Sequence, residues 1–555
     1  MMFQKNILYF LLTGLTTAWS SLAFGQNPQG FFLNDAVRKK VEQPDYVKHK
    51  PSDKPVSLAV NLDAKQTNGL ISKYIYGTNS NTYMGPIVDQ TELLENIKNL
   101  SPKIIRFPGG NLSNVYFWNA SKNKRPADVP QVILYGDDRP VKPENLWYGI
   151  SDDQNSFSLD RYYQLLKATN TAGIICVNYS YARYGTGSAP VQNAAHLAAD
   201  WVRFDKGKTK FWEIGNENYG TWQAGYKIDT LQNKDHQPEF ISGKLYGEHL
   251  KVFADSMKAA AKEIKSEIFI GAVMIETAKD KSWEGGITKN WIDGLLKSAG
   301  SEIDYYVLHS YYTPYNQNST PEIILNSATT ETAKMVSYMK ELSSVYHLPE
   351  KPLALTEWNI FASGAKQSCS FINGMHAAIV LGELSNLKFG MASRWDLANA
   401  YSNGDDHGMF NKGDEPGVPL WNPRPVYYYM YYFQRFFGDE LLKTNSPTNG
   451  DVLTYASKFS SGEMGVVIVN KGSSEQVIEL DIANFKPLKT YFLYSLTGGN
   501  DNGAFSQKVL VNGETTKYSA GGPPNPKKVK ALSASSTGKI KFESAPLSVQ
   551  YLLIE

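Results

Sequence analysis

Two short stretches of the sequence each place a glutamate at the end of an apolar run. Residues 212–217 read Trp-Glu-Ile-Gly-Asn-Glu and end at Glu217, and residues 355–359 read Leu-Thr-Glu-Trp-Asn and carry Glu357. Each apolar run is typical of a buried strand, so each glutamate lies at or just past a strand's C-terminal end. Cleavage of a glycosidic bond with retention of configuration needs two carboxyl groups about 5 Å apart across the bond. The two stretches therefore predict such a site if both strands belong to one sheet.

The elements that must position these glutamates alternate along the chain. The predicted strands are 74–79, 103–108, 173–178, 210–215, 267–274, 304–311, 352–357 and 389–396. The predicted amphipathic helices between them are 89–100, 158–170, 191–203, 241–266, 288–299, 320–345 and 370–387. Eight strands, apolar throughout and separated by helices, are the pattern of a parallel barrel covered on both faces. We therefore predict an α/β fold with a (β/α)8 TIM barrel over residues 71–437.

The mouth of such a barrel lies at the C-terminal strand ends, where Glu217 and Glu357 would meet. Two long connections, 109–157 and 397–424, are predicted to be loops over one rim. After residue 438 short apolar runs are separated by Gly, Ser, Asn and Pro clusters, which predicts an antiparallel β-sandwich over 438–555. The alternating strand within 55–70 has no place in the barrel and is predicted to join this sandwich.

The N-terminal residues resemble an export signal. Residues 1–25 combine the positive charge of Lys5, an apolar run and small residues at 23 and 25, so cleavage would expose Gln26. The alternative, a membrane anchor, needs about 20 apolar residues, and this run is shorter. We predict a secreted or periplasmic protein that is free of the membrane once the signal is cleaved. Residues 26–54 are polar and are predicted to form a tether.

Composition excludes several classes of function. The 555 residues are 42% hydrophobic and 20% charged, and the net charge of +2 provides no field to attract nucleic acid or an anionic membrane. The sequence contains no Gly-x-Ser-x-Gly, phosphate-loop or Gly-x-Gly-x-x-Gly motif, which disfavours a serine hydrolase or a nucleotide-binding enzyme. No His-Glu-x-x-His spacing occurs, and we predict neither metal nor other cofactor. The state of Cys176 and Cys369 and the oligomeric state stay open.

Several polar residues near the predicted strand ends could support the two glutamates. Arg106 stands in an apolar strand and, if buried rather than on the surface, could hold a carboxylate in its ionised form. Asn216 could hydrogen-bond a sugar hydroxyl beside the cleaved bond. The turn at 108–110, Pro-Gly-Gly, could bring Asn111 toward the mouth. Glu213 is predicted to be a buried partner of Arg106 rather than a catalytic group.

Three further residues carry two interpretations each. His309 and Tyr311 end the sixth predicted strand, where a tyrosine could hydrogen-bond the nucleophile or simply pack in the core. Trp395, at the end of the eighth, could be a platform for a sugar ring or a core residue.

These stretches resemble retaining glycoside hydrolases of clan A, most closely family 51, which contains α-L-arabinofuranosidases and some endo-β-1,4-glucanases. The resemblance is carried by residues 106–111, 213–220, 222–223, 309–312 and 357–359. It implies that Glu217 is the general acid/base and Glu357 the nucleophile. It also implies that Arg106 orients the nucleophile and that Asn216 binds the 2-hydroxyl.

Two positions depart from the pattern of the family. Arabinofuranosidases of the family carry a glutamate that grips the furanose where Asn81 stands here, and Trp395 is more similar to the sugar platform of pyranose-active clan members. We expect a secreted enzyme that degrades plant or algal polysaccharide or its oligosaccharides by double displacement, similar to an arabinofuranosidase or an endoglucanase. A catalytically silent carbohydrate-binding protein on the same scaffold is the alternative, and an esterase is a weaker one.

Overall fold

A computed structural model describes residues 27–122, 124–142, 145–277, 285–401, 407–444, 450–485, 490–536 and 538–555. The predicted signal peptide over residues 1–25 lies outside the described residues. No helix in the described part of the chain is both long enough and apolar enough to span a bilayer.

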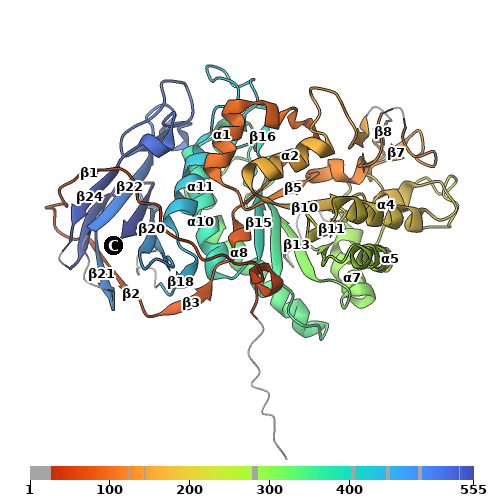
Figure 1. Cartoon of the computed structure of the whole chain (residues 1–555), viewed down its shortest axis with the longest axis horizontal. Coiled ribbons are helices and arrows are strands. Elements are labelled where there is room, and N and C mark those ends of the chain that lie inside the picture. Colours follow the sequence, from red (N-terminus) through yellow and green to blue (C-terminus); the bar gives the residue numbers. More distant parts are fainter. Residues whose placement is uncertain are drawn as a thin grey trace, which may run out of the picture.

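A closed barrel of eight parallel strands forms the larger part of the fold (Figure 1). Its strands are β4 (Gly77–Asn79), β5 (Ile104–Phe107), β10 (Ala172–Val177), β11 (Phe211–Ile214), β12 (Phe269–Val273), β13 (Tyr305–Ser310), β14 (Leu353–Trp358) and β15 (Met391–Arg394). The barrel closes where β15 pairs with β4. The predicted TIM barrel is thus confirmed. Cys176, in β10, is a buried free thiol, and Cys369 is buried as well.

Helices between the strands form the outer layer of the barrel. The longer ones are α1 (Thr91–Leu100), α2 (Leu159–Thr169), α4 (Pro190–Asp205), α5 (Gly243–Glu263), α7 (Trp291–Ala299), α8 (Pro321–Val345), α10 (Phe371–Asn386) and α11 (Pro425–Phe436). Short helices also occur: α3 (Tyr181–Tyr184), α6 (Gly286–Lys289) and α9 (Ala365–Ser368). Seven of the longer helices match predicted ones. α11 was not predicted, because its Tyr-Tyr-Tyr-Met-Tyr-Tyr-Phe run has no polar face and nearly all of it is buried.

The two long connections contain short two-stranded sheets as well as loops. In the first, β6 (Tyr116–Phe117) pairs with β9 (Trp147–Tyr148), and β7 (Ile133–Leu134) pairs with β8 (Pro140–Val141). In the second, β16 (Ala398–Asn399) pairs with β17 (Phe410–Asn411). Parts of the two connections that were predicted as loops are therefore short paired strands.

Two further sheets pack against each other beside the barrel, on the α11 side in Figure 1. The larger has the order β1-β24-β22-β26-β20-β19-β18-β3, with β23 paired to β22, and the smaller the order β2-β21-β25. Their bounds are β1 (Tyr46–Lys48), β2 (Leu58–Asp63), β3 (Thr67–Leu70), β18 (Glu440–Leu442), β19 (Val452–Lys458), β20 (Met464–Asn470), β21 (Gln476–Ala483), β22 (Thr490–Gly498), β23 (Val509–Val511), β24 (Ala531–Ser535), β25 (Ile540–Ser544) and β26 (Ser548–Ile554). Because β2 and β3 precede the barrel, the predicted sandwich completed by such a strand is confirmed.

The described residues of the predicted tether, 27–54, are anchored at both ends. A 3-10 helix, η1 (Gly30–Leu33), places Phe32 at the N-terminal end of the barrel, where its ring lies 4.9 Å from that of Phe211 and 5.5 Å from that of Tyr305. Farther on, β1 pairs in parallel with β24 of the sandwich. This segment therefore crosses from the barrel to the sandwich, and the short Phe-Phe pair was too weak a pattern to reveal it.

We predict that Phe32→Ala destabilises the whole chain. Phe32 is fully buried, and replacing a buried phenylalanine with alanine costs about 3–5 kcal/mol. Thermal unfolding should show a clear fall in Tm. Val37→Ala is the control, since Val37 is 78% exposed in the same segment. Equal melting temperatures for the two variants would contradict a role for Phe32 in closing the barrel.

Candidate active site

Polar side chains from five elements converge at the C-terminal ends of the barrel strands. Arg106 comes from β5, His309 from β13 and Glu357 from β14. Asn79 ends β4, and Glu217 lies just past the end of β11. The barrel therefore brings together residues that are far apart in the sequence.

The backbone after β11 turns sharply and delivers Glu217 to this group. Gly215 has φ of 80° and Glu217 a φ of 44°. A Cβ atom on residue 215 would lie 2.1 Å from Oδ1 of Asn218, so only glycine fits there. The turn thus explains the glycine of the Gly-Asn-Glu motif.

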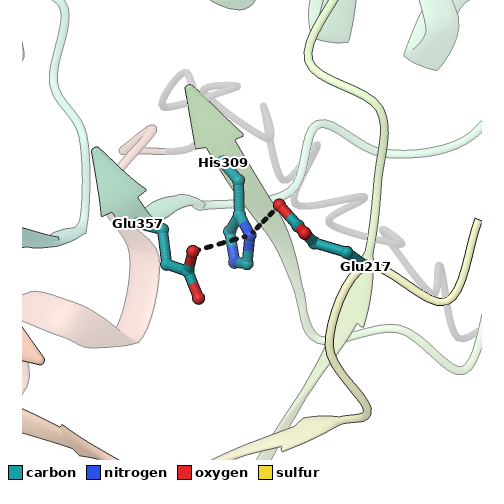
Figure 2. A group of neighbouring side chains, drawn as sticks. All are labelled: Glu217, His309 and Glu357. Carbon is teal, nitrogen blue, oxygen red and sulfur yellow. Dashed lines mark hydrogen bonds and ion pairs between the residues drawn. The ribbon is translucent and has the colours of Figure 1, made fainter. Parts of the chain in front are cut away.

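The two predicted glutamates face each other across His309 (Figure 2). One carboxylate oxygen of Glu217, one ring nitrogen of His309 and one carboxylate oxygen of Glu357 all lie within 4.8 Å of one another. Nδ1 of His309 is 2.9 Å from Oε1 of Glu217 and 3.6 Å from Oε2 of Glu357. The Glu217 side chain is 16% exposed and that of Glu357 is 4% exposed. Glu217 thus lies on the more open side of the pair.

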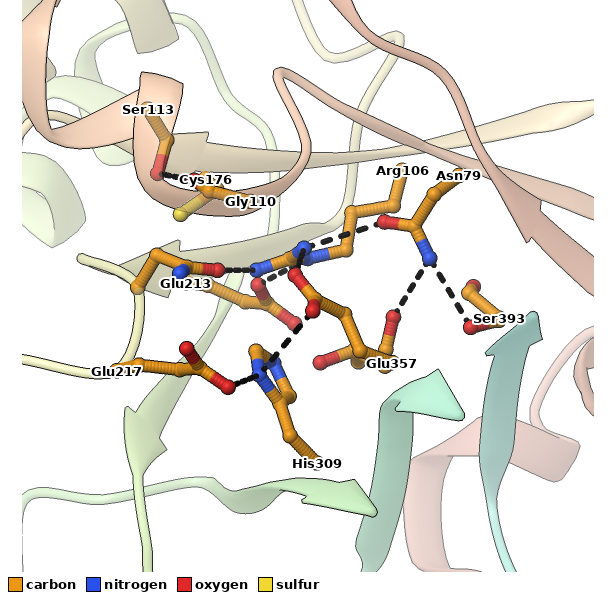
Figure 3. A network of polar contacts seen from close by, with 12 residues as sticks. Asn79, Arg106, Gly110, Ser113, Cys176, Glu213, Glu217, His309, Glu357 and Ser393 are labelled. Carbon is orange, nitrogen blue, oxygen red and sulfur yellow. Dashed lines mark hydrogen bonds and ion pairs between the residues drawn. The ribbon is translucent and has the colours of Figure 1, made fainter. Parts of the chain in front are cut away.

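Arg106 is the centre of a buried network around Glu357 (Figure 3). Its Nε donates to Glu213 at 2.6 Å, and its Nη1 donates to Glu357 at 2.8 Å and to Asn79 at 3.1 Å. Its Nη2 donates to Oδ1 of Asn216 at 2.9 Å. A buried charge is tolerated only when it is paired and hydrogen-bonded, and these contacts meet that condition. Glu213 is the buried partner of Arg106, as the sequence predicted.

Besides His309, two neutral donors hold Glu217. The indole N–H of Trp222 donates to its Oε2 at 2.7 Å, and Nε2 of Gln223 donates to the same oxygen at 3.3 Å. Asn114 fixes this arrangement, because its Nδ2 donates to Oε1 of Gln223 at 2.7 Å and to the carbonyl of Asn216 at 2.8 Å. The two carboxylates therefore have different environments, as two different roles would require.

Burial and mutual electrostatic interactions shift the pKa values of Glu217, His309 and Glu357. Burial raises the pKa of Glu357, and this outweighs the opposing effect of His309 and Arg106, so the pKa lies above its usual range. Burial also acts to raise the pKa of Glu217, but the hydrogen bond and charge of His309 lower it below its usual range. Burial lowers the pKa of His309, yet the charges of Glu357 and Glu217 raise it overall. The ligand-free site therefore favours an ionised Glu217 beside a protonated His309.

Other residues singled out from the sequence also reach this site. The Tyr311 hydroxyl donates to Oε2 of Glu357 at 3.0 Å. Among the described residues, the buried Nδ2 of Asn216 has no hydrogen-bond partner and is available to a ligand. Trp395 is half-buried, and its ring covers Gly109 and Gly110, where added Cβ atoms would come within 2.8 and 2.5 Å of it.

Two asparagines from the sequence prediction lie differently from each other. Asn111 is exposed on the 3-10 helix η5 (Gly110–Val115), and the buried Asn114, one turn later, takes part in the site instead. Asn81 is buried, and its Nδ2 donates to Tyr83 at 3.0 Å and to Asp396 at 3.2 Å. Asn79, Asn114, Tyr83 and Asp396 were missed. Each of these four residues lies one to three positions from a residue that the sequence had singled out, and this closeness was the signal that could have revealed them.

The geometry of Glu217, His309 and Glu357 would admit a metal ion, since each offers a ligand atom. The surroundings oppose one. Arg106 places a positive charge 2.8 Å from Glu357, and the Trp222 N–H already uses an oxygen of Glu217. A second cation at this point would be repelled by the guanidinium.

A family model described as "Alpha-L-arabinofuranosidase 1 domain" matches residues 96–324. A probable alpha-L-arabinofuranosidase C of Aspergillus flavus is 23% identical over 299 residues, which cover 50% of this chain and 52% of that protein. The match thus spans about half the length of this relative.

Solved structures share the fold over most of the chain. A GH51 alpha-L-arabinofuranosidase from Thermotoga petrophila has a TM-score of 0.63 and 18% identity, with 90% of this chain and 100% of that chain covered. CelM2, a bifunctional glucanase-xylanase from a metagenome library, has a TM-score of 0.58 and 14% identity over 90% of this chain and 99% of that chain. The resemblance to family 51 seen in the sequence motifs is confirmed.

Proposed function

We propose, from this likeness to glycoside hydrolase family 51, that the chain is a secreted glycoside hydrolase that acts with retention of configuration. The proposal rests on the carboxylates of Glu217 and Glu357. One oxygen of each lies within 4.8 Å of an oxygen of the other. Retaining enzymes separate their carboxyl groups by about 5 Å, whereas inverting enzymes leave a wider gap for water.

The reaction proceeds in two displacements. Glu357 attacks the anomeric carbon, and the bond to the leaving oxygen breaks as Glu217 gives that oxygen its proton. Glu217 then takes a proton from water, the water attacks the anomeric carbon, and the bond to Glu357 breaks. Nδ2 of Asn216, which has no hydrogen-bond partner among the described residues, would donate to the hydroxyl next to the anomeric carbon during both steps.

The roles follow from the donors around each carboxylate. Arg106 and Tyr311 donate to Glu357, which stabilises the anion that must attack. In the ligand-free site the pKa of Glu217 is lowered and that of Glu357 is raised, so Glu217 is the more readily ionised of the two. Glu217 must therefore gain a proton when the sugar binds, before it can act as the acid. Nδ1 of His309 is hydrogen-bonded to Glu217 at 2.9 Å, so a protonated His309 can pass its proton to that carboxylate.

The substrate class is a plant or algal polysaccharide or oligosaccharide. The names of the relatives favour an α-L-arabinofuranoside. The half-buried ring of Trp395 at the mouth favours a second candidate, a β-linked pyranoside, because a flat indole face can stack on a pyranose ring.

A panel of glycosides tests this function. 4-Nitrophenyl α-L-arabinofuranoside, β-D-xyloside and β-D-glucoside should be assayed beside glucan, xylan, arabinan and agarose. Turnover of at least one substrate is expected. Binding without turnover of any of them would support the silent sugar-binding alternative.

Export is part of the same proposal. N-terminal sequencing of protein recovered outside the cytoplasm should begin at Gln26, and an intact N-terminus in exported protein would contradict cleavage there.

A further inference from the structure

A large cavity lies at the N-terminal end of the barrel, opposite the mouth that holds Glu217 and Glu357. Its volume is about 1210 Å³, above the roughly 300–1,000 Å³ of an ordinary small-molecule site. Tyr76, which precedes β4, and Lys103, which precedes β5, form part of its wall. Residues 35–42, α2 and the C-terminal end of α11 also line it. The two displacements use none of these residues.

Positive charge dominates the wall of this cavity. Among its described lining residues, eight are Lys or Arg and four are Asp or Glu. Three of the acids form ion pairs with cations of the same wall, namely Asp439 with Arg38, Asp35 with Lys73, and Glu42 with Arg435. Lys103 forms no ion pair with a described residue, and its Nζ donates to Oγ of Ser101 at 2.9 Å. The wall therefore holds more positive charge than its own acids neutralise.

The cations at the centre of the wall repel one another. Burial and the charges of Lys73 and Arg435 lower the pKa of Lys103 below its usual range, and the charge of Glu42 opposes them only in part. Burial and the charge of Lys103 lower the pKa of Lys39 to about 7. Like charges held close together disfavour each other's ionised form, and a bound anion would relieve that repulsion. The wall therefore suits a negatively charged group.

Several buried polar atoms in the same wall have no partner. Among the described residues, neither the hydroxyl of Tyr76, a residue that is 7% exposed, nor Nε of Arg435 has a hydrogen-bond partner. Oδ1 of Asp439 is a buried acceptor that also has none, while Oδ2 accepts from Nε of Arg38 at 2.9 Å. A buried polar group without a partner is costly. These atoms therefore indicate a ligand that brings both acceptors and hydroxyl donors.

An acidic sugar combines these properties. A sulfate ion would satisfy the cations but brings no donor for Asp439, whereas a sugar carries hydroxyl groups beside its anionic group. The ring of Phe204, which is 45% exposed, also lines the cavity and offers an apolar face to the C–H groups of a sugar.

We propose that this cavity is a second, non-catalytic site that binds a sugar unit bearing a carboxylate or a sulfate ester within a polysaccharide chain. The choice of a sugar rests on the proposed function. Lys103 and Arg435 bind the anionic group, and the Tyr76 hydroxyl donates to an oxygen of the sugar. Oδ1 of Asp439 accepts from a hydroxyl. Because the site lies at the other end of the barrel from the mouth, it holds the enzyme near a polymeric substrate by a second attachment.

Isothermal titration calorimetry with matched oligosaccharides tests this site. The ligands are galacturonate oligosaccharides, galactose oligosaccharides that carry sulfate esters, and unsubstituted galactose oligosaccharides of the same length. The unaltered chain and its Glu357→Ala variant should both bind one acidic series at least about tenfold more tightly than the neutral one. The series that binds identifies the anionic group. Rising ionic strength should weaken this binding, because salt screens the charges of the wall.

Three variants locate the binding. Lys103→Gln removes a cation of the wall and should weaken binding of the acidic series about tenfold to hundredfold. Tyr76→Phe removes only a hydroxyl without a partner, so it should weaken binding about twofold to tenfold and leave Tm no lower than that of the unaltered chain. Lys340→Gln, at an exposed position on α8 outside the cavity wall, is the matched control and should bind like the unaltered chain.

Two results would overturn the inference. One is an equal affinity of the unaltered chain, Lys103→Gln and Tyr76→Phe for the acidic series, including the case in which none of them binds it. The other is binding of inorganic sulfate or of duplex DNA at least as tight as that of the acidic series. Either result beside turnover of a glycoside would leave the proposed function intact. Binding that depends on Lys103, in a chain that cleaves no glycoside, would instead overturn the proposed function alone.

Discussion

Replacing Glu357 with alanine is expected to reduce kcat by on the order of 10⁴-fold or more, because no other group can form the covalent intermediate. Azide added to this variant should enter the vacated space and attack the anomeric carbon directly. The glycosyl azide product should then have the configuration opposite to that of the substrate. Turnover and the azide product are measured by release of the leaving group and by proton NMR.

The matched control for this variant is Glu350→Ala, which removes an exposed carboxylate shortly before the same strand and should have unaltered turnover. Thermal unfolding must accompany both measurements, because Arg106 loses one of its two carboxylate partners in the Glu357 variant. Near-normal turnover by a folded Glu357→Ala protein would remove Glu357 from the mechanism.

Replacing Glu217 with glutamine is expected to lower kcat by roughly 10²- to 10⁴-fold on substrates with poor leaving groups, since the amide can neither donate nor accept the required proton. The loss in the first step should be much smaller for a glycoside with an activated leaving group such as dinitrophenolate, which needs no proton. Azide should again restore turnover, but its product should retain the configuration of the substrate because the intermediate on Glu357 forms first. A series of leaving groups measured by steady-state and burst kinetics provides the check.

Glu239→Gln is the matched control, because Glu239 is exposed in the connection between β11 and α5 that also contains Glu217. The stereochemistry of the two azide products separates the roles. If the Glu217 variant gave the inverted azide and the Glu357 variant the retained one, the two assignments would have to be exchanged. A Glu217→Gln protein with full activity would favour a role in binding alone.

Much of the fold could be predicted because burial on both faces leaves a clear pattern in the sequence. The barrel strands are continuous apolar runs, and their predicted ranges overlap all eight observed strands. α11 could not be predicted, since a helix buried between the barrel and the sandwich has no polar face. The crossing of residues 27–54 was also hidden, because its anchorage depends on Phe32 and on pairing between β1 and β24, which are far apart in the sequence.

The sequence predicted those site residues that have a charged side chain and lie in or just after an apolar strand. Glu217, Glu357 and Arg106 each follow or lie within an apolar strand, and the barrel rule places them at one mouth. The asparagines on the loop after β5 show the limit. Asn111 was chosen for its distance from a turn, yet in the structure Asn111 is exposed and Asn114, three residues later in η5, is buried. Asp396 was passed over because its partner Tyr83 lies on a different strand connection.

The configuration of the first product tests the central claim most directly. Proton NMR of a reaction with the unaltered chain, recorded before mutarotation, identifies the anomer that is released. Two carboxylates with facing atoms within 4.8 Å predict a product with the same anomeric configuration as the substrate. Release of the opposite anomer would mean that water attacks the sugar directly, and the account of Glu357 as a nucleophile would be wrong.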